Sequence, residues 1–213
     1  MDFQLFLEYI PQLINEPLTA TASHRKMAPL ERIKELANVD YSEKNPKKAA
    51  VMMLFYPKKG VTHLVLIVRN SYKGVHSSQV AFPGGKFEKN DLIFENTALR
   101  ETEEEIGISS NKMQIIKPFT SLYIPPSNFL VYPFLGICKE EISFVPDPKE
   151  VADIIELPLS FFLSEAIHQN AILTTSYANE INVPVFKNEE HIVWGATAMI
   201  LSELKDVLKS VLK

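Results

Sequence analysis

Hydrophobic residues recur at helical spacing near both ends of the chain, whereas the centre is dominated by short apolar runs. Residues 2–15 carry apolar side chains on one predicted helix face, and Pro11 is placed to kink or end that helix. Residues 195–212 form an amphipathic stretch that is typical of a helix packed on a core. Its apolar stripe consists of Met199, Ile200, Leu204, Val207, Leu208 and Val211.

The pattern between these helices predicts strands separated by turn residues. A continuous apolar run at 49–56 is followed by a turn at 57–60 and a second strand at 62–68. Further strands are predicted at 79–82, 112–123, 129–138, 151–157, 173–177, 183–186 and 191–194, with an extended piece at 142–145. The remaining segments are predicted as short helices at 30–38 and 158–167 and as a loop at 19–29. Together they predict a mixed α/β fold with a sheet between helices.

One predicted helix, at 92–106, is unusually rich in acid. Asp91 is a suitable N-cap for it, and Gly107 suits the left-handed position after its last turn. Four of its last six residues are glutamates, and three of these share one helix face, namely Glu101, Glu104 and Glu105. Like charges at this spacing repel by a few tenths of a kcal/mol per pair, and the helix dipole disfavours anions there. This arrangement indicates a binding site for Mg²⁺ or Mn²⁺, which prefer carboxylate oxygens.

Composition narrows the class of protein. The chain has 213 residues, of which 46% are apolar and 23% charged, as in an ordinary globular protein. Cys138 is the single cysteine, which excludes a disulfide framework and a cysteine zinc site and fits a reducing, cytoplasmic compartment. The N-terminus lacks the basic region of a secretory signal, and no apolar run reaches the ~18 residues of a membrane span. With a net charge of -4, no nucleic-acid partner is expected.

Charge is divided around the Gly84-Gly85 turn. Residues 44–87 contain eight basic residues and no acidic one, whereas residues 88–105 contain seven acidic residues and two basic ones. A site at this boundary would place an anionic ligand beside a metal ion. The alternative is that these lysines are solvated strand and loop residues.

The residues around the turn resemble a known family. Gly85, Asp91 and the run Arg100-Glu101-Thr102-Glu103-Glu104-Glu105-Ile106-Gly107-Ile108 resemble the Nudix box of Nudix hydrolases. Asp91 stands where the box has an early glutamate, and the spacer before Arg100 is one residue longer.

Neighbouring segments resemble the coenzyme A pyrophosphatase branch of that family, which shares both departures. They are Met27-Ala-Pro29, Lys48-Ala-Ala-Val51, His76-Ser-Ser-Gln79-Val-Ala-Phe82-Pro-Gly-Gly85, Thr97-Ala-Leu-Arg-Glu-Thr102, Pro133-Phe-Leu-Gly136 and Val193-Trp-Gly-Ala-Thr197. Gly74 and Ser78 fit the branch less well, because its members commonly have arginine near the first and glycine at the second. Lys73 is a candidate for the missing cation.

The resemblance implies an α/β/α Nudix fold with a mixed central sheet, an N-terminal helical extension at 1–40 and a hydrolase domain at 41–213. It implies hydrolysis of a diphosphate with Mg²⁺ or Mn²⁺ as cofactor. The implied metal ligands are Glu101, Glu104, Glu105 and the Gly85 carbonyl. Arg100 would orient Glu104, and Glu150, just before a predicted strand, is a candidate general base with a surface acid as the alternative.

The implied substrate is coenzyme A or its thioesters, with 3',5'-ADP and 4'-phosphopantetheine or its acyl form as products. The candidate substrate-binding residues are Arg69, Lys73, His76, Gln79 and Phe82. For Phe82 the alternative, a side chain that fills the core, is slightly favoured. A loop at 125–129 stands where the branch often builds its acyl-carrier pocket.

Two other functions remain open at this point. The first is hydrolysis of another nucleoside diphosphate derivative, such as ADP-ribose, a dinucleotide or a nucleoside triphosphate. The second is a non-catalytic Nudix-fold ligand sensor, against which the complete glutamate set argues. The sequence also leaves a homodimer open.

Overall fold

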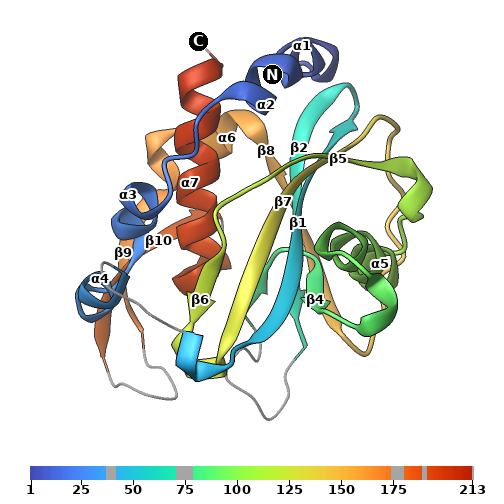
Figure 1. Ribbon diagram of the computed structural model, residues 1–213. Helices are drawn as coiled ribbons and strands as arrows, with labels where there is room; N and C mark the ends of the chain where they lie inside the picture. The colour runs from blue at the N-terminus through green and yellow to red at the C-terminus, as the bar shows by residue number, and fades with distance from the viewer. Residues whose placement is uncertain (37–41, 71–78, 174–179, 189–190, 213) are drawn as a thin grey trace.

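A mixed β-sheet forms the centre of the protein (Figure 1). The computed structural model describes residues 1–36, 42–70, 79–173, 180–188 and 191–212. In these residues eight strands form the sheet, with the path β3-β2-β1-β7-β5, and β4, β6 and β8 pair with β1, β7 and β2. The strands are β1 (Lys47–Lys58), β2 (Val61–Arg69), β3 (Val80–Ala81), β4 (Gly84–Lys86), β5 (Met113–Pro118), β6 (Leu122–Ile124), β7 (Phe129–Cys138) and β8 (Val151–Pro158).

Strands β1 and β7 make a parallel pair at the centre of the sheet, and the other pairings are antiparallel. Both faces of β1 are buried, which explains why its sequence is a continuous apolar run rather than an alternating one. The predicted strands at 49–56 and 62–68 are confirmed within β1 and β2. Strand β1 continues through Pro57, so only Lys59 and Gly60 form the turn.

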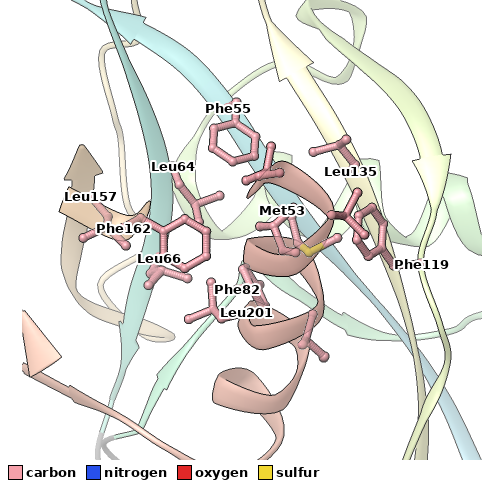
Figure 2. Close-up of a cluster of buried hydrophobic side chains, with 14 of the residues drawn as sticks. Met53, Phe55, Leu64, Leu66, Phe82, Phe119, Leu135, Leu157, Phe162 and Leu201 are labelled. Atoms are coloured by element: carbon pink, nitrogen blue, oxygen red, sulfur yellow. The ribbon is translucent and has the colours of Figure 1, made fainter. Parts of the chain in front are cut away.

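Helices cover both faces of the sheet, which confirms the predicted α/β/α class (Figure 1). Helix α5 (Phe94–Ile106) lies on one face, where Ala98 and Ile106 pack against alternate residues of β1. Helix α7 (Gly195–Val211) lies on the other face, and Figure 2 shows Leu201 of this helix among the buried side chains of the sheet. The predicted stripe of α7 is confirmed, because all six of its residues are buried.

The N-terminal segment forms short helices. They are α1 (Phe3–Glu8), α2 (Ile10–Asn15), α3 (Thr21–His24), the 3₁₀ turn η1 (Arg25–Met27) and α4 (Leu30–Leu36). Of these, α2, α3 and η1 pack against α7. Phe3, Phe6 and Leu13 belong to the same buried cluster as α7. The predicted loop at 19–29 was therefore wrong, because it contains α3 and η1. The predicted helix at 2–15 divides at Tyr9, and Pro11 lies in the first turn of α2.

Buried polar groups tie this N-terminal segment to α7. Glu203 is fully buried, and its carboxylate accepts hydrogen bonds from the Ala20 N–H at 2.7 Å and the Thr120 hydroxyl at 2.6 Å. The His24 Nε2 atom lies 3.4 Å from the same carboxylate. The sequence pattern did not predict that Glu203 is buried, because it indicated a single apolar stripe on α7. In the structure, polar residues outside that stripe are buried as well.

A second, three-stranded antiparallel sheet follows β8 and α6 (Leu159–Leu163). It consists of β9 (His168–Leu173), β10 (Ile181–Asn188) and β11 (His191–Val193). The strands predicted at 183–186 and 191–194 correspond to β10 and β11. The strand predicted at 173–177 overlaps β9 only at Leu173, because β9 begins earlier, at His168. Residues 174–177 lie outside the described part of the chain.

Other predicted boundaries also changed. Residues 112–123 contain two strands, β5 and β6, rather than one, and residues 142–145 form no strand in the described structure. The predicted helix at 158–167 consists of α6 and a 3₁₀ turn, η6 (Glu165–Ile167). No helix of the described residues has both the length and the apolar character required to cross a membrane.

Candidate active site

Helix α5 presents two of its glutamates to strand β4. Glu105 is 1% exposed, and its Oε2 accepts a hydrogen bond from the backbone N–H of Gly84 at 2.7 Å. The side chain of Glu101 is 13% exposed, and its carboxylate lies against Gly85. Because these residues stand four apart on the helix, both reach the same short strand. Glu104 lies at the more open side of this face, with its side chain 58% exposed.

Two glycines allow this close approach of helix and strand. A Cβ atom on Gly85 would lie 2.3 Å from Oε2 of Glu101, so a larger residue there would displace the carboxylate. Gly84 has a φ of +147°, and a Cβ atom there would lie 2.4 Å from the backbone oxygen of Ala50. A larger residue at position 84 would thus clash with the backbone, whereas one at position 85 would clash with the Glu101 side chain.

Arg100 connects the acidic face to Asp91. Its guanidinium lies 2.9 Å from Oε2 of Glu104, 3.0 Å from Oε1 of Glu101 and 2.7 Å from Oδ1 of Asp91. The hydrogen bond to Asp91 raises the pKa of Arg100. In return, hydrogen bonding to Arg100 holds the pKa of Asp91 well below its usual value. Buried Asp91 therefore holds the Arg100 guanidinium in position, and Glu101 and Glu104 both contact it.

The prediction that Asp91 caps α5 was wrong. The helix begins at Phe94, with Ile93 as N-cap, and Asp91 closes the preceding 3₁₀ turn, η3 (Lys89–Asp91). Its buried carboxylate accepts hydrogen bonds from the Thr97 hydroxyl and the Glu88 N–H, both at 2.8 Å. An acid at this position therefore fixes the turn and Arg100 rather than the helix N-terminus. The predicted left-handed Gly107 at the end of α5 is confirmed, with φ +74°.

The two carboxylates facing β4 carry perturbed acidities. Burial raises the pKa of Glu105 to about 7, opposed by the Gly84 N–H and by Arg69, whose Nη1 lies 3.2 Å away. Burial also raises the pKa of Glu101, and the neighbouring Glu104 and Glu150 carboxylates add to this. Desolvated acids that repel one another are stabilised by a cation, and clusters of perturbed acids are typical of functional sites.

Glu150 belongs to the same acidic group although it lies far away in sequence. It stands directly before β8, as predicted, and its backbone oxygen accepts a hydrogen bond from the Asn70 N–H at 2.9 Å. Its charge raises the pKa of both Glu101 and Glu105. Glu103, by contrast, is exposed on another side of the helix and accepts a hydrogen bond from the Ser110 N–H at 2.8 Å.

The donor set suits a hard divalent cation. The Glu101 carboxylate lies against Gly85, Glu105 accepts a hydrogen bond from Gly84, and Glu104 shares Arg100 with Glu101. Oxygen ligands are those that Mg²⁺ and Mn²⁺ prefer. In the described ranges, no three His, Cys, Asp or Glu side chains are already grouped to hold an ion. Arg100, Arg69 and the Gly84 N–H occupy these carboxylates instead, so cation binding requires them to exchange partners.

A cavity of about 790 Å³ adjoins the glycine strand on the α7 side of the sheet. Its lining includes β-strand residues beside the glutamates, the 125–129 loop and the beginning of α7. The lining residues include Arg32, Arg69, Gln79, Phe82, Gly84, Gly85, Tyr123, Ser127, Phe129 and Trp194. Arg69 joins the two parts of the site, because it lines the cavity and also contacts Glu105.

The cavity contains some of the predicted substrate-binding residues. Arg69 and Gln79 are part of its wall. Phe82 also lines it but is 2% exposed and packs in the core near Leu201, so both interpretations of Phe82 apply (Figure 2). Lys73 and His76 lie outside the described residues.

Sequence reasoning missed two cavity residues. Arg32 comes from α4 in the N-terminal segment, and Trp194 directly precedes α7. Trp194 is half-buried, whereas the preceding Val193 is buried. Trp194 lies in a segment that carried the family resemblance, which was the available signal. Arg32 lay in no such segment.

Comparison with known proteins identifies the family of this chain. The model of the NUDIX domain family matches residues 46–173. A Photorhabdus laumondii protein named uncharacterized Nudix hydrolase NudL is 34% identical over 160 residues, which cover 75% of this chain and 84% of that protein. Nudix hydrolase 15, mitochondrial, from Arabidopsis thaliana is 32% identical over 165 residues, covering 73% of this chain and 56% of that protein.

Solved structures show the same fold at low sequence identity. The Nudix hydrolase RenU from M. smegmatis superposes with a TM-score of 0.54 at 15% identity, covering 78% of this chain and 88% of that one. A MutT/nudix family protein from Enterococcus faecalis gives a TM-score of 0.51 at 17% identity, covering 89% and 73%. The family match, the identity to NudL and the shared fold together show that the chain belongs to the Nudix family and is a Nudix pyrophosphohydrolase.

Proposed function

We propose that this enzyme hydrolyses the diphosphate bond of coenzyme A or its thioesters. The products would be 3',5'-ADP and 4'-phosphopantetheine or its acyl form. The observation that carries this proposal is the cavity, which extends from Gly84 and Gly85 beside the glutamates to the 125–129 loop. Its volume of about 790 Å³ lies in the upper part of the usual range for small-molecule sites, as an extended substrate requires.

The glutamates of α5 supply the catalytic centre in this proposal. Glu101, Glu104, Glu105 and the Gly85 carbonyl would hold Mg²⁺ or Mn²⁺. When bound, a divalent cation supplies positive charge to the diphosphate oxygens and acidifies water. Arg100, held by Asp91, positions Glu104 through their 2.9 Å contact. The resulting contribution is mainly positioning and electrostatic stabilisation of charge on the diphosphate.

Glu150 is the proposed general base. It is the acid from outside α5 whose charge is felt by both Glu101 and Glu105, which favours a place near the attacking water over a remote surface position. Its position directly before β8, outside α5, leaves the glutamates of α5 to hold the metal. Its removal is therefore expected to lower kcat more than it weakens metal binding.

In this proposal, basic and polar residues of the cavity bind the diphosphate. Arg69 offers a bidentate donor at the junction of the cavity and the glutamates. Gln79 forms a polar part of the cavity wall, and Phe82 forms an apolar part. We propose that Lys73 and His76 add contacts to the phosphates. Phe129 would contact the pantetheine arm.

A substrate panel tests this function. The protein is incubated with Mg²⁺ or Mn²⁺ and coenzyme A, acetyl-coenzyme A, ADP-ribose, a diadenosine polyphosphate or ATP, and the products are identified by mass. Coenzyme A turnover should depend on the metal and fall at least ~100-fold in Glu104→Gln, because a metal-directed or water-directed carboxylate is lost. Glu103→Gln, on the same helix but facing away, is the matched control.

The outcomes separate the alternatives. Turnover of ADP-ribose, dinucleotide or nucleoside triphosphate with coenzyme A untouched would overturn the substrate assignment but keep the reaction class. Binding without turnover of any substrate would favour a ligand sensor. A folded Glu104→Gln protein with full activity would refute the role of Glu104.

A further inference from the structure

An arginine outside the family-matched region reaches the cavity. Arg32 lies on α4, before residue 46 where the NUDIX match begins, yet it is part of the cavity lining. Its side chain is held in place, because Nη2 donates a hydrogen bond to the backbone oxygen of Tyr123. An arginine oriented by the protein loses little further freedom when it binds an anion.

Further polar groups lie around Tyr123 in the cavity wall. The Tyr123 hydroxyl is 3.0 Å from Oδ1 of Asn128, which keeps this part of the loop in place. The Lys44 Nζ atom lies over the Tyr123 ring, 5.4 Å from its centroid, so a second cation stands near Arg32. Ser127 lines the same cavity, and its buried Oγ has no hydrogen-bond partner in the described part of the chain.

These features differ from those at the diphosphate side of the cavity. There the cation is Arg69, on β2, which contacts Glu105. At the other wall Arg32 reaches the cavity from α4 and the Ser127 hydroxyl from the 125–129 loop, whereas Lys44, in the turn before β1, lies over the Tyr123 ring and is not among the described lining residues. A second anionic group on the substrate would therefore meet the Arg32 guanidinium and a hydroxyl donor at this wall.

We propose that Arg32 recognises a phosphomonoester on the ribose of the substrate. The inference rests on the proposed function, because coenzyme A carries such a group on the 3' oxygen of its adenosine. A 2'-phosphate, as in NADPH, offers the same chemistry. The N-terminal segment thereby supplies a specificity-determining residue to a site whose catalytic groups come from the family domain.

Matched substrate pairs test the recognition of this phosphate. Coenzyme A is compared with dephospho-coenzyme A, and NADPH with NADH, using the wild type, Arg32→Ala and Arg32→Lys. Arg25→Ala is the control, since Arg25 is an exposed arginine of the same segment and not among the described lining residues. Binding of 3',5'-ADP and 5'-AMP is measured by calorimetry in parallel, and Tm is recorded for each variant.

We expect Arg32→Ala to lower kcat/KM for coenzyme A by about tenfold to hundredfold, through KM, as for loss of a charged hydrogen bond. Turnover of dephospho-coenzyme A should stay unchanged. Arg32→Lys should recover part of the loss, and Arg25→Ala should behave as wild type. The preference for 3',5'-ADP over 5'-AMP should disappear in Arg32→Ala.

An equal loss for both members of a pair would assign Arg32 a purely structural role and overturn the inference. So would a wild type that does not distinguish phosphorylated from dephosphorylated substrates. Cleavage of NADPH, with an Arg32-dependent preference over NADH and no cleavage of coenzyme A, would support phosphate recognition while overturning the coenzyme A assignment. Selectivity for coenzyme A that persists in Arg32→Ala would overturn the inference and leave the proposed function intact.

Discussion

The buried carboxylate of Glu105 accepts a hydrogen bond from the Gly84 backbone at 2.7 Å, which joins α5 to β4. Burial makes the negative charge of Glu105 unfavourable and raises its pKa to about 7, and the hydrogen bond from Gly84 partly offsets this effect. The two elements of the proposed metal site are thus connected before any ion binds.

Glu105→Gln is expected to separate metal binding from folding. The amide keeps an acceptor for the Gly84 N–H but removes the charge, so the metal-free Tm should be retained. Mg²⁺ at about 100 times its Kd should stabilise the wild type by about 2.7 kcal/mol, and the variant much less. Thermal denaturation with and without Mg²⁺ measures this, with Glu103→Gln as control. Equal stabilisation of both proteins would exclude Glu105 as a ligand.

The two glycines of β4 should respond differently to alanine. In Gly85→Ala the new methyl meets only the end of the Glu101 side chain, at 2.3 Å, so the protein should fold but lose Mg²⁺-dependent activity by at least ~100-fold. In Gly84→Ala the methyl meets backbone atoms, and the φ of +147° is unsuitable for alanine. That variant should lose stability instead. Circular dichroism and activity assays distinguish the two, and similar behaviour of both would contradict this assignment.

Asp91→Asn should reduce stability and alter its pH dependence. The variant loses a charged contact with Arg100, which keeps Glu101 and Glu104 as partners, and should be about 1.5–3 kcal/mol less stable at pH 7. Because the folded-state pKa of Asp91 is depressed, its stabilisation is present above its usual pKa of ~3.9 and is lost as pH falls. The gap between wild type and variant should therefore narrow below pH 4. Urea denaturation at several pH values tests this, and a constant gap would contradict it.

Glu203→Gln should loosen the N-terminal segment, which we propose is an extension of residues 1–40 packed on a domain of 41–213. The change removes the charge beside His24 and weakens the bonds from Ala20 and Thr120. We expect a loss of about 1–3 kcal/mol and faster proteolysis within the extension. Glu8→Gln, at an exposed position of the same segment, is the control. Unchanged proteolysis with unchanged stability would show that this buried contact does not hold the segment.

The sequence predicted the features that depend on local pattern. The apolar run of β1 and the stripe of α7 identified their elements because burial is reflected directly in periodicity. The spacing of Glu101 and Glu105 predicted a shared helix face for the same reason. Gly107 was identifiable because a left-handed helix end strongly favours glycine.

Features that depend on distant contacts were less accessible. Asp91 looks like a helix cap in sequence, and only the position of Arg100 shows that it anchors a guanidinium. The cavity is assembled from several separated segments, so Arg32 carried no local signal. The grouping of Glu150 with α5 depends likewise on the path of the chain between them.

The Ala20–Glu203 hydrogen bond joins residues 183 positions apart. During synthesis, Ala20 is made long before its partner in α7. The N-terminal segment therefore gains this contact only after the intervening chain, which includes the glutamates of α5, has been synthesised. Docking of the segment that carries Arg32 is consequently coupled to the folding of α7, a helix far away in the chain.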